Sequence, residues 1–480
     1  MYNLFYQLLS IIAPLITTPY ITRILGSERI GVHSYYYSVA VYFSLFILLG
    51  LNNYGTRTIA SCGNNKVEFS KNFINIYVFQ LFCGAVVSIL YLLYAMLFSD
   101  NSIVSLILYI YVFGAILDIN WFFFGLELFR LTSLRNILIK FLSVLAIFTF
   151  VKTENDLYIY TLIISLSYML NQLFLWTFLK KYVTFTKPHL AEIKKHIKPD
   201  LTLFLTVLLV SLFKIMDKIM LGIMSGYNEV GFYEASEKII AIPLSIITAL
   251  GVVMLPRSSN FASNNDVPGL KKYIKISIVF AMFISSSMCF GIMSVSKEFI
   301  PLFYGEGFDE CVYIYIALLP SCIFLAFANV IRTQYLLPNK MDRSYIISAA
   351  LGAVANIVVN LLLIPSMGAV GAAIGTFVAE AAVCVYQVCS VRKYLDTTSY
   401  ISASIPFIVS GIIMFIILYF FIPDMMNMPV SLIIKVVCGI LIYFSLLSAY
   451  SYIYKAAFGK NWYAIDVIKR EIKERDDNNV

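Results

Sequence analysis

Charged residues are scarce in this sequence. Only 13% of its 480 residues are Asp, Glu, Lys or Arg, and 60% are hydrophobic. Soluble domains carry about 25% charged and about 45–50% apolar residues. So few charges cannot cover the surface of a water-soluble fold of this length. The composition therefore argues against a soluble enzyme and predicts an integral membrane protein.

Clusters of metal ligands and reactive thiols are also missing. The chain has 3 His and 8 Cys, no Cys-x-x-Cys occurs, and most cysteines fall inside apolar segments. We therefore expect neither a metal site nor a disulfide framework. No glycine-rich phosphate loop with its lysine occurs either, so we expect no nucleotide hydrolysis, no cofactor and no nucleic-acid partner.

We do not expect a cleavable leader at the start of this sequence. The chain opens almost directly into an apolar segment at 4–21, with no basic region and no small-residue cleavage site. We expect a retained first helix. Apolar segments of about 18–25 residues can cross a bilayer as helices, and we predict fourteen. They cover 3–22, 33–51, 74–98, 103–124, 133–151, 158–179, 200–224, 235–256, 275–296, 312–331, 344–364, 369–391, 400–422 and 430–454.

The distribution of basic residues predicts the orientation of these spans. With both termini cytoplasmic, the inner loops and the tail hold 26 Lys and Arg, and the outer loops hold only Arg23, Arg29, Lys152 and Lys297. Cytoplasmic loops carry such an excess of positive charge. We predict a multi-pass protein of a bacterial cytoplasmic membrane.

Two stretches of the sequence resemble each other. Arg23 precedes Leu-Gly, and a short loop then leads to Ile30-Gly31-Val32-His33; Lys218 likewise precedes Leu-Gly, and Val230-Gly231-Phe232-Tyr233 follows. The copies are six predicted helices apart and so share one orientation, which favours a parallel repeat of two lobes around a cavity. The fold we predict is all-α. Its parts are a first lobe at 1–180, a basic linker at 181–199, a second lobe at 200–395, two added helices at 396–455 and an amphipathic basic tail at 456–480.

Ionisable residues inside the spans are the candidate functional residues, since charges facing lipid are costly. Lys214, Asp217 and Lys218 share the seventh predicted span, at spacings that place them on one helix face. A net positive site there suits an anionic head group, with Arg23 on the opposite wall. The alternative is structural: a Lys214–Asp217 pair that fastens helices, with Lys218 reaching outward.

Other charges in the spans are weaker candidates. Asp118 binds a proton or a sugar, or it serves packing together with Asn120. Lys435 lies near a span end, where we expect it to reach toward the interface. The remaining weaker candidates are Glu237, Lys238 and Glu380.

Several segments resemble the polysaccharide flippases of the multidrug/oligosaccharidyl-lipid/polysaccharide exporter superfamily. They are ITTPYITRILG at 16–26, LGLNNYGTR at 49–57, WFFFGLE at 121–127, the stretch 217–233, and the stretch 356–380. The resemblance implies export of undecaprenyl-pyrophosphate-linked oligosaccharide repeat units for O-antigen or capsule, by alternating access driven by a proton or sodium gradient. It implies roles for Arg23, Lys214, Asp217 and Lys218, and contact with membrane lipid and the polysaccharide polymerase machinery.

Two other functions stay open at this point. A cation-coupled multidrug exporter of the same superfamily is one, although such exporters usually have twelve helices and acidic cavities. A membrane polysaccharide polymerase is the other, and the short outer loops argue against it.

Overall fold

The structure is a computed structural model of the chain. It describes residues 2–63, 65–264, 266–422, 427–458 and 462, without the side chains of 2–11, 213, 214 and 252. The described residues are almost entirely helical and contain no strand, which confirms the predicted all-α class. They divide into two compact units, 1–235 and 236–480. The predicted lobes at 1–180 and 200–395 have other limits and stay a prediction.

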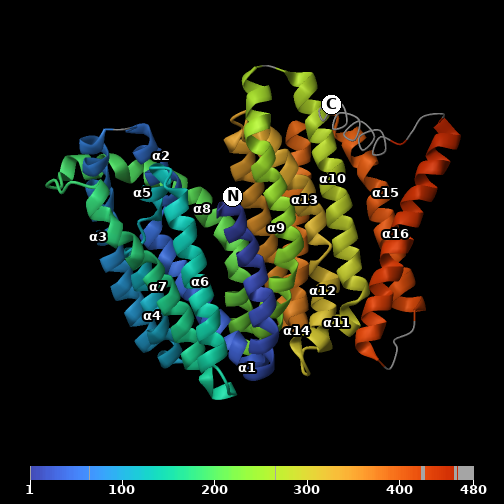
Figure 1. Cartoon of the computed structure of the whole chain (residues 1–480), viewed down its shortest axis with the longest axis horizontal. Coiled ribbons are helices and arrows are strands. Elements are labelled where there is room, and N and C mark those ends of the chain that lie inside the picture. The colour runs from blue at the N-terminus through green and yellow to red at the C-terminus, as the bar shows by residue number, and fades with distance from the viewer. Residues whose placement is uncertain (1, 64, 265, 423–426, 459–461, 463–480) are drawn as a thin grey trace. The chain divides into compact units, whose positions relative to one another are not determined.

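The first unit holds eight helices, one 3₁₀ turn and the start of a ninth helix (Figure 1). These are α1 (Tyr2–Leu48), α2 (Leu51–Ser61), α3 (Lys66–Leu97), α4 (Ser102–Ile116), α5 (Asn120–Gly125), α6 (Phe129–Phe150), η1 (Glu154–Asp156), α7 (Leu157–Tyr182), α8 (Leu190–Met224) and the start of α9 (Tyr227–Ser263).

The second unit holds the rest of α9 and the helices that follow it. These are α10 (Val267–Ser294), α11 (Ser296–Tyr304), α12 (Cys311–Leu318), α13 (Ser321–Ile331), the π-helical turn η2 (Arg332–Leu336), α14 (Asp342–Val391), α15 (Thr397–Ile416), the π-helical turn η3 (Ile417–Phe421) and α16 (Met428–Phe458).

Two long helices are bent at glycines. Gly26 in α1 has φ 70°, and Gly368 in α14 has φ 53°. Residues other than glycine rarely adopt such positive φ values. A straight helix of 50 residues, the length of α14, would be about 75 Å long, more than twice the hydrocarbon core of a bilayer. Each bend falls between two predicted spans, 3–22 and 33–51 in α1, and 344–364 and 369–391 in α14.

Eleven helical segments of the described chain are long and apolar enough to cross a membrane. Two of them, 12–61 and 342–391, include the bent helices and each covers two predicted spans. Helix α8, which covers the seventh predicted span and carries its charges, is not among the eleven. The chain is a multi-pass membrane protein, and the total of fourteen spans stays a prediction.

The fourth predicted span, 103–124, is interrupted in the structure. Helix α4 ends at Ile116 and α5 begins at Asn120. The amide of Gln80, on α3, donates to the carbonyl oxygens of Ala115, Ile116 and Asp118 at 3.1, 3.2 and 2.9 Å. A break at membrane depth is tolerated when protein groups bind the freed carbonyls, and Gln80 does so here.

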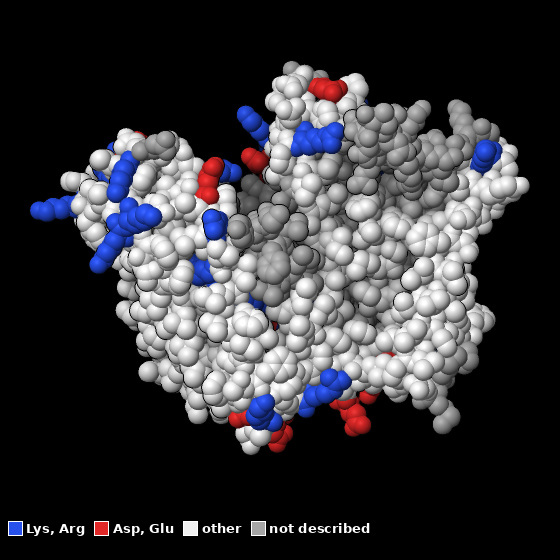
Figure 2. Space-filling view, in the orientation of Figure 1, with Lys and Arg blue, Asp and Glu red and all other residues white. Residues whose placement is uncertain are grey.

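Lys and Arg side chains of the first unit gather at the end where α2 and α5 lie (Figure 2). The surface of this unit beside that end is almost free of charge in the same view. The predicted inner loops of this unit, at 57–71, 130–135 and 180–198, carry many of its Lys and Arg residues. A basic end of the unit agrees with that prediction.

Candidate functional site

The two related sequence stretches meet in the first unit. A Cβ atom at Gly31 would lie 1.7 Å from the carbonyl oxygen of Tyr227, and one at Gly231 would lie 2.0 Å from that of Ser27. Both contacts require glycine. They are also reciprocal, because 27 and 31 lie 200 positions before 227 and 231. A twofold relation between the copies produces such a pattern, and the contact therefore supports the predicted repeat.

A tight turn at Gly226 places two pairs of polar residues beside each other. Gly226 has φ 96°, and its N–H donates to the carbonyl of Leu221 at 3.0 Å, as a glycine does where it ends a helix. The chain then reverses from α8 into α9. Residues 217 and 218 of α8 thereby meet residues 233 and 234 of α9.

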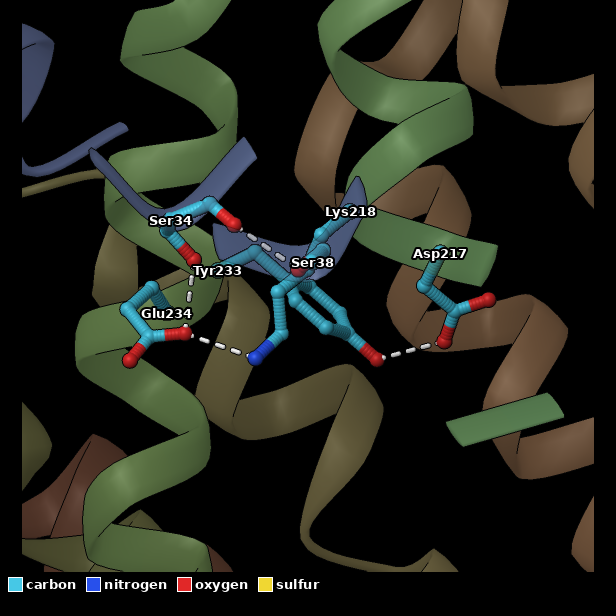
Figure 3. A network of polar contacts seen from close by, with 6 residues as sticks. All are labelled: Ser34, Ser38, Asp217, Lys218, Tyr233 and Glu234. Atoms are coloured by element: carbon cyan, nitrogen blue, oxygen red, sulfur yellow. Dashed lines mark hydrogen bonds and ion pairs between the residues drawn. The ribbon is translucent and has the colours of Figure 1, made fainter. Parts of the chain in front are cut away.

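Lys218 forms an ion pair with Glu234. Its Nζ lies 2.7 Å from Oε2 of Glu234, and the two side chains are only 15% and 18% exposed. The hydroxyl of Ser34, on α1, donates to the same oxygen at 2.8 Å. Figure 3 shows these side chains converging from α1, α8 and α9. The positive charge that we predicted for Lys218 is therefore balanced by a carboxylate from α9.

Asp217 points to the other side of the hairpin. The hydroxyl of Tyr233 donates to its Oδ2 at 2.7 Å, and Asp217 is 1% exposed (Figure 3). The pairing of Asp217 with Lys214, the structural alternative from the sequence, stays a prediction, because the side chain of Lys214 lies outside the described part of the chain. The structure gives Asp217 a tyrosine partner on α9, while the neighbouring Lys218 pairs with Glu234.

The other two residues of the predicted site lie in the same unit. Arg23 is an exposed residue of α1, and its guanidinium donates to the carbonyl of Pro19 at 3.1 Å. Lys214 belongs to α8, but its side chain lies outside the described part of the chain. The joint action of Arg23, Lys214, Asp217 and Lys218 stays a prediction.

Asp118 serves the break between α4 and α5. Its Oδ1 accepts hydrogen bonds from the backbone N–H of Asn120 at 2.9 Å and from the amide of the same residue at 2.7 Å. Asn120 also accepts from Arg135 at 2.9 Å and donates to Gln172 at 2.9 Å. This buried network favours the packing role that we set beside the functional one.

The remaining weaker candidates lie in the second unit. Glu237 and Lys238 are half-buried on α9, and Glu380 is buried on α14. The described contacts do not decide their roles, which stay predictions. In the predicted tail, only 456–458 and Trp462 are described. Trp462 packs against Phe407 and Tyr450, with ring centroids 5.0 and 5.2 Å away.

Sequence reasoning missed two residues and misplaced a third. Glu234 was not selected, although it follows directly after the Val-Gly-Phe-Tyr motif. Glu298 was not selected either, and Lys435, which we expected to reach the interface, is 1% exposed and forms an ion pair with it. The expectation for Lys435 was wrong: its ammonium group does not extend to the interface but pairs with the buried carboxylate of Glu298, on α11.

Comparison with known proteins agrees with this fold. The family described as "Polysaccharide biosynthesis protein" matches residues 1–262. A protein named "Putative O-antigen transporter" from Escherichia coli (strain K12) is 22% identical over 338 residues, which are 69% of this chain and 81% of the relative.

Two solved structures share the fold. The lipid II flippase MurJ in an inward closed conformation has a TM-score of 0.75 and 15% identity, over 96% of this chain and 99% of that one. An inward-facing multidrug resistance MATE family transporter of the MOP superfamily has a TM-score of 0.63 and 16% identity, over 80% of this chain and 94% of that one. The relatives are transporters and flippases rather than enzymes.

Proposed function

The chain belongs to the polysaccharide biosynthesis protein family, and from this premise we propose that it is a flippase for lipid-linked oligosaccharides. Its cargo is an undecaprenyl-pyrophosphate-linked repeat unit of O-antigen or capsule, carried from the inner to the outer leaflet of a bacterial cytoplasmic membrane. The observation that carries the proposal is the family match over 1–262 together with the O-antigen transporter relative.

The paired Lys218 supplies a physical reason for head-group binding. A pyrophosphate is a polyanion, and a lysine held in a partly buried place interacts with it more strongly than one in water. Glu234 neutralises Lys218 when no anion is present, so cargo binding exchanges one anionic partner for another. Arg23 and Lys214 add positive charge to the same unit and complete the proposed site.

Alternating access completes the proposed mechanism. The α1–α9 contact at Gly31 and Gly231 involves both copies of the repeat. Opening of the proposed cavity on the side of the membrane where this contact lies therefore requires the two glycines to separate. A proton or sodium gradient drives the cycle. Both chain termini lie on the cytoplasmic side, and the polysaccharide polymerase machinery receives the exported unit.

The test is complementation of a strain that lacks this gene and any redundant exporter. We expect lipid-linked repeat units to accumulate in the inner leaflet and wild-type protein to restore their export. Lys218→Ala, Lys214→Ala and Arg23→Ala each reduce export, whereas Lys194→Ala, at an exposed position of α8, does not. Export of the units in the deletion strain would remove the proposed function, and full export by all three variants would remove only the site.

A cation-coupled multidrug exporter is the second candidate function. The MATE-like fold favours it, with a TM-score of 0.63. It predicts that overexpression raises resistance to cationic drugs, and that neutralising acidic residues abolishes this effect. If overexpression leaves drug sensitivity unchanged while the protein restores export of repeat units in the deletion strain, the protein is the flippase and not the drug exporter.

A further inference from the structure

A carboxylic acid is buried near the start of α8 without a side-chain partner. Asp200 is 0% exposed, and no side chain among the described residues forms a hydrogen bond or an ion pair with its carboxyl oxygens. Gly50, between α1 and α2, lies against it: a Cβ there would be 2.4 Å from the carbonyl oxygen of Asp200 and 3.0 Å from Oδ1. An ionised carboxylate in such a place is costly, so this packing favours the protonated acid.

The backbone N–H of Gly50 favours the ionised form of Asp200, but less than burial disfavours it. The side chains that face Asp200 add no positive charge. They are Tyr54 of α2 and Cys83 of α3, which lie within electrostatic range of its carboxyl group, and His196, one turn earlier on α8. Burial lowers the pKa of His196, which leaves the imidazole neutral at neutral pH. No described Lys or Arg forms an ion pair with Asp200.

A pocket lies next to this acid. It has a volume of about 540 Å³ and is open to the outside. Its lining comes from α2, with Tyr54, Arg57, Thr58 and Ser61, and from α8, with Pro199, Thr202 and Leu203. The hydroxyl of Tyr54 also lies 2.7 Å from Nδ1 of His196. A hydroxyl and an imidazole thus connect the pocket with the helix turn that carries Asp200.

Pro199 precedes Asp200 within α8. Proline lacks the N–H that would bind the carbonyl of Lys195, and helices bend at such points. The helix therefore lacks one backbone hydrogen bond between the turn that holds His196 and Asp200. This position, at the wall of the pocket, is where α8 can bend.

We propose that Asp200 is the proton-binding residue that couples transport to a proton gradient. It holds a proton while α8 packs against Gly50. The proton leaves through His196 and Tyr54 to water in the pocket when α8 separates from Gly50, a movement that a bend at Pro199 allows, and the acid becomes a hydrated carboxylate. The inference rests on the proposed flippase function, because it identifies where the gradient acts on that transport.

Infrared spectroscopy of the purified full-length protein tests the proton site without any transport. On titration from acid to alkaline pH, we expect the wild type to lose the C=O band of a buried protonated carboxylic acid. Asp200→Asn lacks this change, and Asp200→Glu retains it at a shifted midpoint. Glu192→Gln is the matched control on α8, since hydrogen bonding from Lys195 lowers the pKa of Glu192 and keeps it ionised. An unchanged band in Asp200→Asn overturns the proposal.

Transport into proteoliposomes loaded with undecaprenyl-pyrophosphate-linked oligosaccharide tests the coupling. We expect an imposed pH gradient to accelerate wild-type translocation, and Asp200→Asn to translocate without responding to the gradient. His196→Gln slows the response and keeps the infrared band. A gradient response in Asp200→Asn, or a wild type that responds only to sodium, overturns the inference. Absence of any wild-type translocation overturns the flippase function, while the infrared result still reports on the proton site.

Discussion

Lys218 and Glu234 depend on each other at the residue scale. Glu234→Gln leaves the lysine without its carboxylate in a place where both side chains are less than one-fifth exposed. We expect a loss of about 1–3 kcal/mol of stability, measured as a lower melting temperature in detergent. Glu28→Gln, at an exposed position of α1, is the control. The exchange Lys218→Glu with Glu234→Lys restores part of the loss, and a melting temperature that Glu234→Gln leaves unchanged contradicts the pairing.

Sequence reasoning reached one half of this pair. Lys218 and Asp217 stand out because charges are rare in spans, and helical spacing places them near Lys214. Glu234 lies at the start of the next helix, where a charge is unremarkable. Its pairing depends on the reversal at Gly226, whose geometry sets a separation of 16 residues for both contacts. A helical periodicity within one span cannot reveal a partner across a turn.

At the scale of helices, the close contact between α1 and α9 predicts that alanine at either of its two glycines destabilises the fold. Gly31→Ala and Gly231→Ala each force a methyl group against a backbone carbonyl. Backbone cannot move aside as a side chain does, and overpacking costs about 1–3 kcal/mol. We expect a reduced folded yield and melting temperature in both variants. Gly291→Ala, where no atom lies within 4 Å of the added Cβ, should behave as wild type, and equal melting temperatures for all three variants would contradict the close contact.

The ion pair between α11 and α16 gives a second expectation at this scale. Lys435→Met leaves Glu298 buried at 3% exposure with Ser431 as its remaining described partner. Breaking a buried pair costs about 3–5 kcal/mol, whereas replacing both partners by apolar residues is often neutral. The double variant Lys435→Met with Glu298→Leu should therefore melt at a higher temperature than either single variant. The opposite order would show that the charges act independently.

The whole molecule was predictable in class and in family, and less so in detail. Scarce charge and long apolar segments are properties of composition, and they led to an all-helical membrane protein, which the structure confirms. The resemblance of 16–26, 49–57 and 217–233 to polysaccharide flippases is confirmed by the family match. The break at 117–119 was not foreseen, because the only strongly polar residues of the segment 103–124 are Ser105, Asp118 and Asn120. Gln80, which binds the carbonyl groups freed at the break, lies on another helix.

Fourteen spans with both termini inside make a prediction for the molecule as a whole. In a cysteine-free variant, single cysteines at Thr153 and Glu306 lie in predicted outer loops, and those at Lys194 and Asn264 lie in predicted inner ones. All four positions are exposed. A membrane-impermeant maleimide added to intact cells should label the first two and reach the others only after the membrane is opened. Since each span reverses the side of every loop after it, one miscounted helix between 153 and 306 would place Glu306 on the side opposite to Thr153. Agreement of the four positions therefore tests the number of spans in this part of the chain as well as its orientation.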